Sequence, residues 1–189
     1  MNKKWLVADD ISADCRTQLD RWASEPVLQQ LFWNRNLKNE EQAMNFVRRQ
    51  ISHDADAYNL AGMTRSVERI LDAVDAGQLI AIYGDYDVDG VTATLVLKEG
   101  LEAYGAEVVT YIPDRHLEGY GVHSTVVEKL ANQGVNLIIS VDCGISALAE
   151  VKKASELGMD FIVTDHHQIG SELPEALAVI NPNRPDCAY

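Results

Sequence analysis

Hydrophobic and polar residues follow two different patterns along this chain. Up to about residue 77, apolar positions recur at spacings of three and four residues, and Gly77 ends the clearest of these stretches. That stretch contains Met63, Val67, Ile70, Leu71 and Val74. Such spacing is typical of helices that bury one face, and glycine commonly follows a helix. Residues 1–77 are therefore predicted to form a helical N-terminal segment that packs on the domain after it.

From residue 78 onward, short apolar runs alternate with helical patterns. The predicted strands are residues 79–83, 107–112, 137–141, 161–164 and 178–180, and the predicted helices between them are 91–104, 124–133 and 146–157. Continuous apolar runs are typical of parallel strands that are covered on both faces. Strands alternating with helices indicate right-handed βαβ units. Residues 78–189 are therefore predicted to form an α/β domain, with a mostly parallel five-stranded sheet flanked by helices.

Charged and imidazole side chains stand at the carboxyl ends of the first four predicted strands. In chain order they are Asp85, Asp87 and Asp89 after the first strand, Arg115 and His116 after the second, Asp142 after the third, and Asp165, His166 and His167 after the fourth. Ligands of open α/β sheets bind outside this edge. These side chains are therefore predicted to gather in one site.

The three aspartates at alternate positions indicate a metal site. Like charges this close repel one another unless a cation lies among them, and carboxylate oxygens are ligands that Mg²⁺ and Mn²⁺ prefer. A solvated turn is the plain alternative, because Asp and Gly favour turns. A calcium loop fits less well, since a strand precedes Asp85 where that loop requires a helix, and its twelfth position is Val96 rather than glutamate. We expect a two-metal hydrolase site.

The remaining polar residues give weaker signals, and each keeps a structural alternative. Adjacent histidines point in different directions on an extended backbone, so one of them can bind a metal while the other faces the substrate; both can also be plain surface residues. Asp142 can equally cap a helix. Arg115 suits a phosphate group or a salt bridge within its loop, and the nearby glycines permit close approach of the backbone. The candidate substrate-binding residues are Arg115, His116, Gly119, Gly121 and Arg184.

Composition changes this picture in one respect. The 189 residues have an ordinary hydrophobic fraction of 47%, three cysteines without zinc-like spacing and no apolar run of membrane-spanning length, so a globular cytoplasmic protein is expected. The formal net charge of −13, however, opposes non-specific binding of nucleic acid, which relies on lysine and arginine. Cations bound among the acids of the site would offset part of this charge, so charge alone leaves the substrate open.

At these residues the chain resembles the DHH phosphoesterase superfamily, which is named for the motif Asp165-His166-His167. More narrowly, it resembles the RecJ family of exonucleases, which digest single-stranded DNA. The matching segments are Gly84–Ala93, Glu118–Gly121, Val141–Ser146, Asn181–Asn183 and the helical stretch 63–77. Small-substrate branches of the superfamily usually carry a histidine four residues before the aspartate that matches Asp87. This chain has Tyr83 at that position, which favours the RecJ branch.

This resemblance implies a metal-dependent phosphodiesterase that acts as a 5′-to-3′ exonuclease on single-stranded DNA in repair and recombination. Two divalent cations, Mn²⁺ in preference to Mg²⁺, are implied, with Asp142 the best candidate to bridge them. The implied metal ligands are Asp85, Asp87, Asp89, Asp142, Asp165 and His166. The implied catalytic residues are His167, Arg115 and Asp165. The expected partners are single-stranded DNA and, in a longer protein, a single-strand-binding protein or a helicase; a membrane is not among them.

The chain also departs from the family in length. The family uses a further metal-binding aspartate beyond the DHH motif, a second catalytic subdomain and a nucleic-acid-binding domain, and the chain reaches Tyr189 before any of these. We therefore expect an N-terminal fragment, weak or inactive by itself. Two alternatives stay open: a phosphodiesterase for oligoribonucleotides or cyclic dinucleotides, and a non-catalytic scaffold. A scaffold is expected to lose its ligands, whereas the motif acids and histidines are intact here.

Overall fold

The computed structural model describes residues 6–20, 23–48 and 56–187. The chain divides into two compact units, residues 1–55 and residues 56–189, and each is described by itself. The helix that precedes the first strand belongs to the second unit. The division therefore falls before this helix, at residue 55, whereas the sequence pattern placed the boundary after it, at residue 77.

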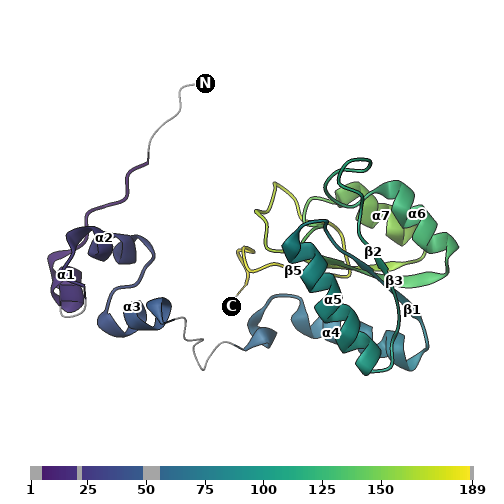
Figure 1. Ribbon diagram of the computed structural model, residues 1–189, viewed down its shortest axis with the longest axis horizontal. Coiled ribbons are helices and arrows are strands. Elements are labelled where there is room, and N and C mark those ends of the chain that lie inside the picture. The colour runs from purple at the N-terminus through teal and green to yellow at the C-terminus, as the bar shows by residue number, and fades with distance from the viewer. Residues whose placement is uncertain (1–5, 21–22, 49–55, 188–189) are drawn as a thin grey trace, which may run out of the picture. The chain divides into compact units, whose positions relative to one another are not determined.

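Helices build the first unit. They are α1 (Ala13–Asp20), α2 (Pro26–Asn34) and α3 (Glu40–Val47), shown in Figure 1. Their small core consists of Ile11, Cys15, Leu19, Ala23, Phe32 and Ala43. Asn39 caps the start of α3, because its side chain accepts a hydrogen bond from the backbone N–H of Gln42. Apolar residues occur all round helix α2, and its Val27 and Leu28 stay exposed.

The second unit is an α/β domain. Its elements are a 3₁₀ turn η1 (Ala57–Asn59), α4 (Met63–Asp75), β1 (Leu79–Tyr83), α5 (Val88–Ala103), β2 (Glu107–Tyr111), α6 (Ser124–Asn132), β3 (Val135–Val141), α7 (Leu148–Glu156), β4 (Asp160–Thr164) and β5 (Ala178–Ile180). All neighbouring strands pair in parallel, in the order β2-β1-β3-β4-β5. The predicted fold class is confirmed.

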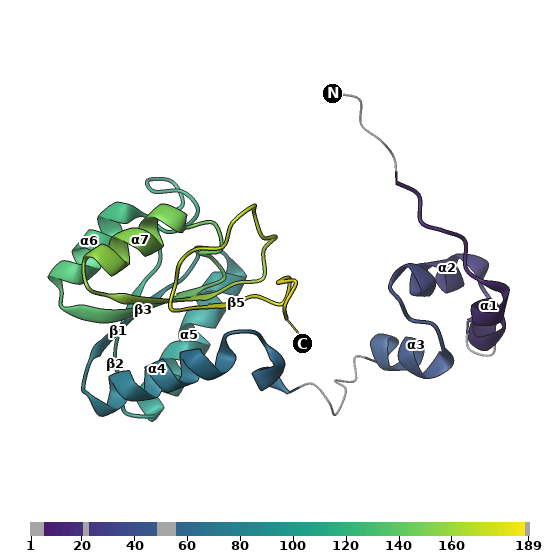
Figure 2. The same ribbon diagram turned by 180° about the vertical axis from the view of Figure 1, so that it is seen from behind.

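Two helical layers cover the sheet. Helices α6 and α7 lie on one face and α4 and α5 on the other, as the opposite views of Figures 1 and 2 show. Ile138 and Val127 belong to the core on the α6–α7 side. Ile80, Ile139 and Leu101 belong to the core on the α4–α5 side. Strands covered on both faces must be apolar on both faces, which explains the continuous apolar runs in the sequence.

The order of the strands determines where a ligand can bind. Strand β1 lies between β2 and β3. The chain therefore runs from β1 to β2 on one side of β1 and then crosses back to form β3 on the other side of β1. A crevice forms outside the carboxyl ends of the strands at such a reversal. The loops after β1 and β3 are therefore neighbours at this switch point, and the loop after β4 lies next to them.

The start of α5 differs from the sequence prediction in a way that matters for the site. The helix begins at Val88 rather than at residue 91, because the Asp87 side chain accepts a hydrogen bond of 3.0 Å from the backbone N–H of Gly90. Asp89 and Gly90 consequently lie in the first turn of the helix. A Cβ atom on Gly90 would stand 2.5 Å from the backbone nitrogen of Asp85, so only glycine allows this close approach.

Within the described residues, no helix combines the length and apolar character that a membrane crossing needs.

Candidate metal centre

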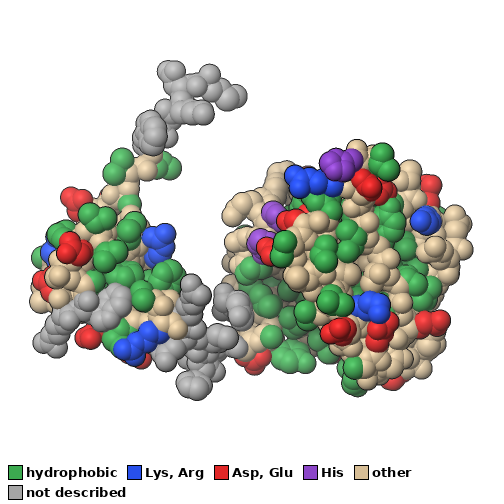
Figure 3. All heavy atoms as spheres, viewed as in Figure 1, with side chains coloured by type: hydrophobic (Ala, Val, Ile, Leu, Met, Phe, Trp, Pro, Cys, Tyr) green, Lys and Arg blue, Asp and Glu red, His purple; other side chains and the backbone are tan. Residues whose placement is uncertain are grey.

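Carboxylates and imidazoles from three loops meet at the carboxyl edge of the sheet. One group comprises Asp85, Asp87 and Asp142, and a second comprises Asp142, His166 and His167. Within each group, one oxygen or nitrogen atom per residue lies within 4.8 Å of the corresponding atoms of the others. Asp142 belongs to both groups. Figure 3 shows acidic and histidine side chains gathered on the surface of this unit.

The backbone of Asp142 has an unusual conformation. Its φ angle is +61°, in the left-handed region that short polar residues tolerate better than other non-glycine residues. Its backbone N–H donates to the carbonyl oxygen of Thr164, at 3.0 Å, which ties the end of β3 to the end of β4. The residue is only 8% exposed, and burial, together with the nearby Asp87, raises the pKa of its carboxyl group. His166 opposes this effect, since its Nε2 lies 2.9 Å from Oδ1 of Asp142.

The Asp85 carboxylate has an unsatisfied oxygen. This residue is 3% exposed, and its Oδ1 atom has no hydrogen-bond partner among the described residues. A buried acceptor without a partner is costly, and for a charged group the penalty exceeds about 1–3 kcal/mol. Asp87 uses its carboxylate to cap α5, and the Gly90 N–H lowers the pKa of its carboxyl group. A hard divalent cation suits this set of carboxylate and imidazole donors and would satisfy the free oxygen of Asp85.

Asp165 stands apart from both groups because its carboxylate already has partners. Oδ2 accepts a hydrogen bond of 2.9 Å from the backbone N–H of Ile145. Oδ1 accepts from the backbone N–H groups of His166 and His167, at 2.7 and 3.0 Å. It also lies 2.8 Å from Nδ1 of the His167 ring. The structure thus shows Asp165 joining the loop after β3 to the two histidines.

His167 is oriented by this carboxylate. The hydrogen bond to Asp165 raises the pKa of the His167 imidazole, and it leaves Nε2 as the ring atom open to a ligand or substrate. The Tyr120 ring meets the His167 ring edge-on at 5.8 Å between centroids. The rings of His166 and His167 lie 4.7 Å apart. The two adjacent imidazoles thus have different partners, Asp142 for His166 and Asp165 for His167.

Two asparagines that the sequence reasoning did not assign to the site hold the histidine backbone. Asn181 is fully buried, and its Nδ2 donates to the carbonyl oxygen of His167 at 2.9 Å. Asn183 donates from Nδ2 to the carbonyl oxygen of His166 at 2.6 Å, and from its backbone N–H to Oδ1 of Asn181. The available signal was their position directly after the last strand, at the same edge as the other polar loops.

The remaining predicted site residues lie outside the two ligand groups. Asp89 lies outside both groups but lines a recess of about 590 Å³ together with Asp142 and His166. Arg115 is exposed, and its guanidinium carbon lies 5.3 Å from the centroid of the Tyr86 ring. The other predicted residues of that loop are His116, which is exposed, and Gly119 and Gly121, with φ angles of +82° and +97°.

Arg184 is engaged elsewhere. Its guanidinium donates to the carbonyl oxygen of Val179 at 2.6 Å and pairs with the Asp186 carboxylate at 2.6 Å. The structure therefore does not bring Arg184 into either group of ligands.

Cys143 is buried, and burial raises the pKa of its thiol, in agreement with a packing role rather than that of a nucleophile.

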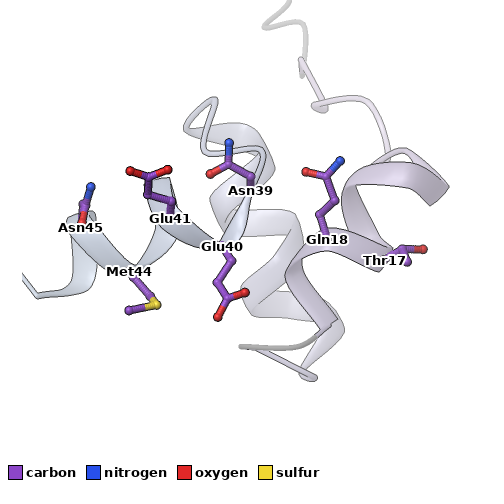
Figure 4. A pocket seen from close by; sticks show the side chains of 7 residues that line it. All are labelled: Thr17, Gln18, Asn39, Glu40, Glu41, Met44 and Asn45. Atoms are coloured by element: carbon purple, nitrogen blue, oxygen red, sulfur yellow. The ribbon is translucent and has the colours of Figure 1, made fainter.

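The first unit has a recess of its own, of about 630 Å³, between α1 and α3. The side chains that line it are Thr17, Gln18, Asn39, Glu40, Glu41, Met44 and Asn45, as Figure 4 shows. Glu40 and Glu41 point to opposite sides of α3 in this view. Both lie in the first turn, where negative charge complements the positive end of the helix dipole. We assign these carboxylates to helix stability rather than to chemistry.

Comparison with known proteins identifies the family. The profile of the DHH family, N-terminal domain, matches residues 79–188, which is more than half of the chain. The chain belongs to the DHH family. Among curated DHH relatives, the single-stranded-DNA-specific exonuclease RecJ of Bacillus subtilis (strain 168) is 41% identical over 164 residues, covering 87% of this chain and 21% of the relative. The resemblance inferred from the motifs is confirmed.

Solved structures of RecJ show the same fold. A crystal structure of exonuclease RecJ bound to manganese matches with a TM-score of 0.62 and 41% identity, over 65% of this chain and 31% of that chain. RecJ from Thermus thermophilus in complex with Mn²⁺ matches with a TM-score of 0.66 and 29% identity, over 94% of this chain and 24% of that chain. The chain spans about a fifth of the length of the Bacillus subtilis relative.

Proposed function

We propose that this chain is the metal-binding part of a phosphodiesterase that digests single-stranded DNA from its 5′ end in repair and recombination. The observation that carries the proposal is the pair of ligand groups that share Asp142 at the switch point of the sheet. Similarity to RecJ, described as single-stranded-DNA-specific, supports the substrate. The manganese in matching RecJ crystal structures supports Mn²⁺, or Mg²⁺, as the cation.

Asp85, Asp87, Asp142 and His166 would hold two divalent cations, with Asp142 shared between them and Asp89 lining the recess beside them. When bound, the cations would polarise the phosphodiester and supply a water nucleophile at neutral pH. The free oxygen of Asp85 and the crowding of carboxylates around Asp142 fit this role, because a cation relieves both. We assign Asp165 to positioning rather than to ligation, since its oxygens accept hydrogen bonds from Ile145, His166 and His167.

The remaining catalytic work falls to His167 and Arg115. With Nδ1 of His167 engaged by Asp165, Nε2 would donate a proton to the leaving oxygen or a hydrogen bond to the phosphate. Arg115 would bind the phosphate, for which the planar guanidinium is suited. His116, Gly119 and Gly121 belong to the same loop and would shape the substrate path. Arg184 would act on the fold, through Asp186, rather than on the substrate.

The proposal extends to partners and location. A single-strand-binding protein or a helicase would supply single strands to the enzyme. DNA as the substrate, and the free thiols of Cys15, Cys143 and Cys187, fit a reducing cytoplasm.

The test uses a chimera in which this chain replaces the matched region of Bacillus subtilis RecJ. Single-stranded and duplex DNA, labelled at either end, would be incubated with Mn²⁺ or Mg²⁺. We expect the single strand to be degraded from its 5′ end, the duplex to survive, and Asp142→Asn to reduce the rate by at least about 100-fold, since a shared ligand is lost.

Circular dichroism and manganese-dependent melting would first establish that the chimera folds. A folded chimera that cleaves dinucleotides but spares long strands would favour a small-nucleotide phosphodiesterase. A folded chimera that cleaves neither would favour a non-catalytic scaffold. The isolated 189-residue chain, assayed in parallel, is expected to bind manganese weakly and to show little or no nuclease activity.

A further inference from the structure

Positive charge is scarce around the proposed site. Residues 56–189 contain 8 Lys and Arg against 21 Asp and Glu, so this unit carries the whole formal charge of −13. In the loops that follow β1 to β4, which the structure describes in full, Arg115 is the only lysine or arginine. If the proposed function is correct, this guanidinium is the only side chain of these loops that brings permanent positive charge to a phosphate. Its placement therefore matters more than that of any other surface cation here.

Arg115 lies in a loop with its own internal framework, here called the arm and defined as residues 114–121. The Asp114 carboxylate accepts hydrogen bonds from the backbone N–H groups of His116 and Leu117, at 2.8 and 3.1 Å. The Asp114 carbonyl oxygen accepts from those of Glu118 and Gly119, at 2.9 and 3.3 Å. These bonds close a turn around Arg115, so the arm has a defined shape although most of its side chains are exposed.

Two tyrosines fasten this turn to the sheet. Tyr83 and Tyr111 are the last residues of β1 and β2, they are paired in register, and their rings lie 5.3 Å apart. The Tyr83 hydroxyl donates to the carbonyl oxygen of Gly121 at 3.2 Å. The Tyr111 hydroxyl donates to Oε1 of Glu118 at 2.5 Å, while Oε2 of Glu118 accepts from the backbone N–H of Asp114 at 2.8 Å. The far end of the arm and its middle are thus both anchored.

The electrostatics agree with this geometry. The Tyr111 hydroxyl, together with the Asp114 N–H, lowers the pKa of Glu118, so that carboxylate stays ionised and keeps both hydrogen bonds at neutral pH. Beyond the arm, the Arg115 guanidinium lies over the ring of Tyr86, which stands between two of the metal-site aspartates. This cation–π contact places Arg115 beside the loop that carries those carboxylates.

We propose that Tyr83 and Tyr111, through Gly121 and Glu118, are positioning residues that hold the arm so that Arg115 is presented to a phosphate before the substrate arrives. The two hydroxyl groups bond to Gly121 and Glu118 rather than to the proposed metal ligands. Pre-organisation of this kind reduces the ordering that binding would otherwise require. Tyr83 thereby has a function in this chain beyond filling the core.

The first test is hydrogen exchange on the 189-residue chain, comparing wild type with Tyr83→Phe, Tyr111→Phe and the double variant. Phenylalanine keeps the ring packing and removes only the hydroxyl. Each lost hydrogen bond is expected to speed exchange of the arm amides, residues 116–119, by about fivefold, and the double variant by about 20-fold. Amides of β3 should not change, and Tyr104→Phe, which alters an exposed tyrosine at the end of α5, should change neither set.

The second test measures the affinity for thymidine 5′-monophosphate with manganese present. The double variant and Arg115→Ala should each weaken nucleotide binding by about 10-fold. The triple variant, which combines Tyr83→Phe, Tyr111→Phe and Arg115→Ala, should weaken it no further. Manganese affinity should stay constant in all of these variants. Glu118→Gln should retain more affinity than Glu118→Ala.

Unchanged exchange of the arm amides in the double variant would overturn the proposal, as would additive losses in the triple variant. If the wild type binds no nucleotide, the phosphate site of the proposed function fails in this chain. The exchange data would still decide whether the tyrosines hold the arm.

Discussion

Replacing Asp142 with asparagine should weaken manganese binding strongly and leave the fold intact. The substitution keeps the size of the side chain and a residue type that tolerates the left-handed backbone at φ +61°. It removes a carboxylate that belongs to both ligand groups. Without metal, Asp142→Asn should be as stable as the wild type or more stable, because it removes a buried charge whose pKa is raised by burial and by Asp87.

The size of the effect follows from linkage. At a manganese concentration of about 100 times the dissociation constant, binding stabilises the folded state by about 2.7 kcal/mol. The second unit has about 130 residues, so its entropy of unfolding is about 0.28 kcal/mol/K and the expected rise in melting temperature is about 10 °C. If Asp142→Asn weakens binding about 100-fold, the same manganese contributes about 0.4 kcal/mol, or about 1–2 °C.

The assay is thermal unfolding followed by circular dichroism, in EDTA and then in manganese. Asp142→Ala serves as a second variant. It should melt about 4 °C below Asp142→Asn in EDTA, because alanine in the left-handed region costs about 1 kcal/mol. Asp75→Asn, an exposed acid at the end of α4, is the matched control and should keep the full manganese shift. A full shift of about 10 °C in Asp142→Asn would refute the assignment of Asp142 as the shared ligand.

Two further substitutions test the surroundings of the site. Gly90→Ala should destabilise the folded state by about 1–3 kcal/mol, because its Cβ would stand 2.5 Å from the Asp85 backbone. Gly100→Ala in the same helix is the control: its Cβ would meet nothing within 4 Å, so it should stabilise the folded state by about 0.5–1 kcal/mol. Chemical denaturation measures both changes, and equal effects would contradict the close-approach argument. Asn183→Asp should lower manganese affinity about 10-fold by removing the donor to the His166 carbonyl. Asn132→Asp, at the end of α6, is the control. Unchanged affinity in calorimetry would show that this hydrogen bond does not support the site.

The sheet was predictable because its strands are local patterns. Apolar runs gave residues 79–83 and 178–180 as strands with the bounds that the structure has. The parallel arrangement then placed the polar loops at one edge. The helix α5 begins three residues earlier than predicted, since a side-chain cap from Asp87 decides its start and apolar spacing carries no trace of that bond.

Individual roles within the site were less predictable, because they depend on partners distant in sequence. Asp165 carries the family motif and is expected to be a ligand, yet one of its hydrogen bonds comes from Ile145, twenty residues earlier. Arg184 is a candidate for substrate binding until its pairing with Asp186 is seen. Tyr83 and Tyr111 are far apart along the chain and meet only through strand pairing. Such contacts follow from tertiary structure, which sequence spacing does not encode.

The central claim is that the carboxyl edge of the sheet holds divalent metal, and anomalous diffraction tests it most directly. Crystals of this chain would be soaked in Mn²⁺ and measured near the manganese absorption edge. We predict an anomalous peak about 2.1 Å from the Asp142 carboxylate, with Nε2 of His166 or the free oxygen of Asp85 as a further ligand. Manganese bound elsewhere, with no peak beside Asp142 at a concentration that raises the melting temperature, would contradict the account.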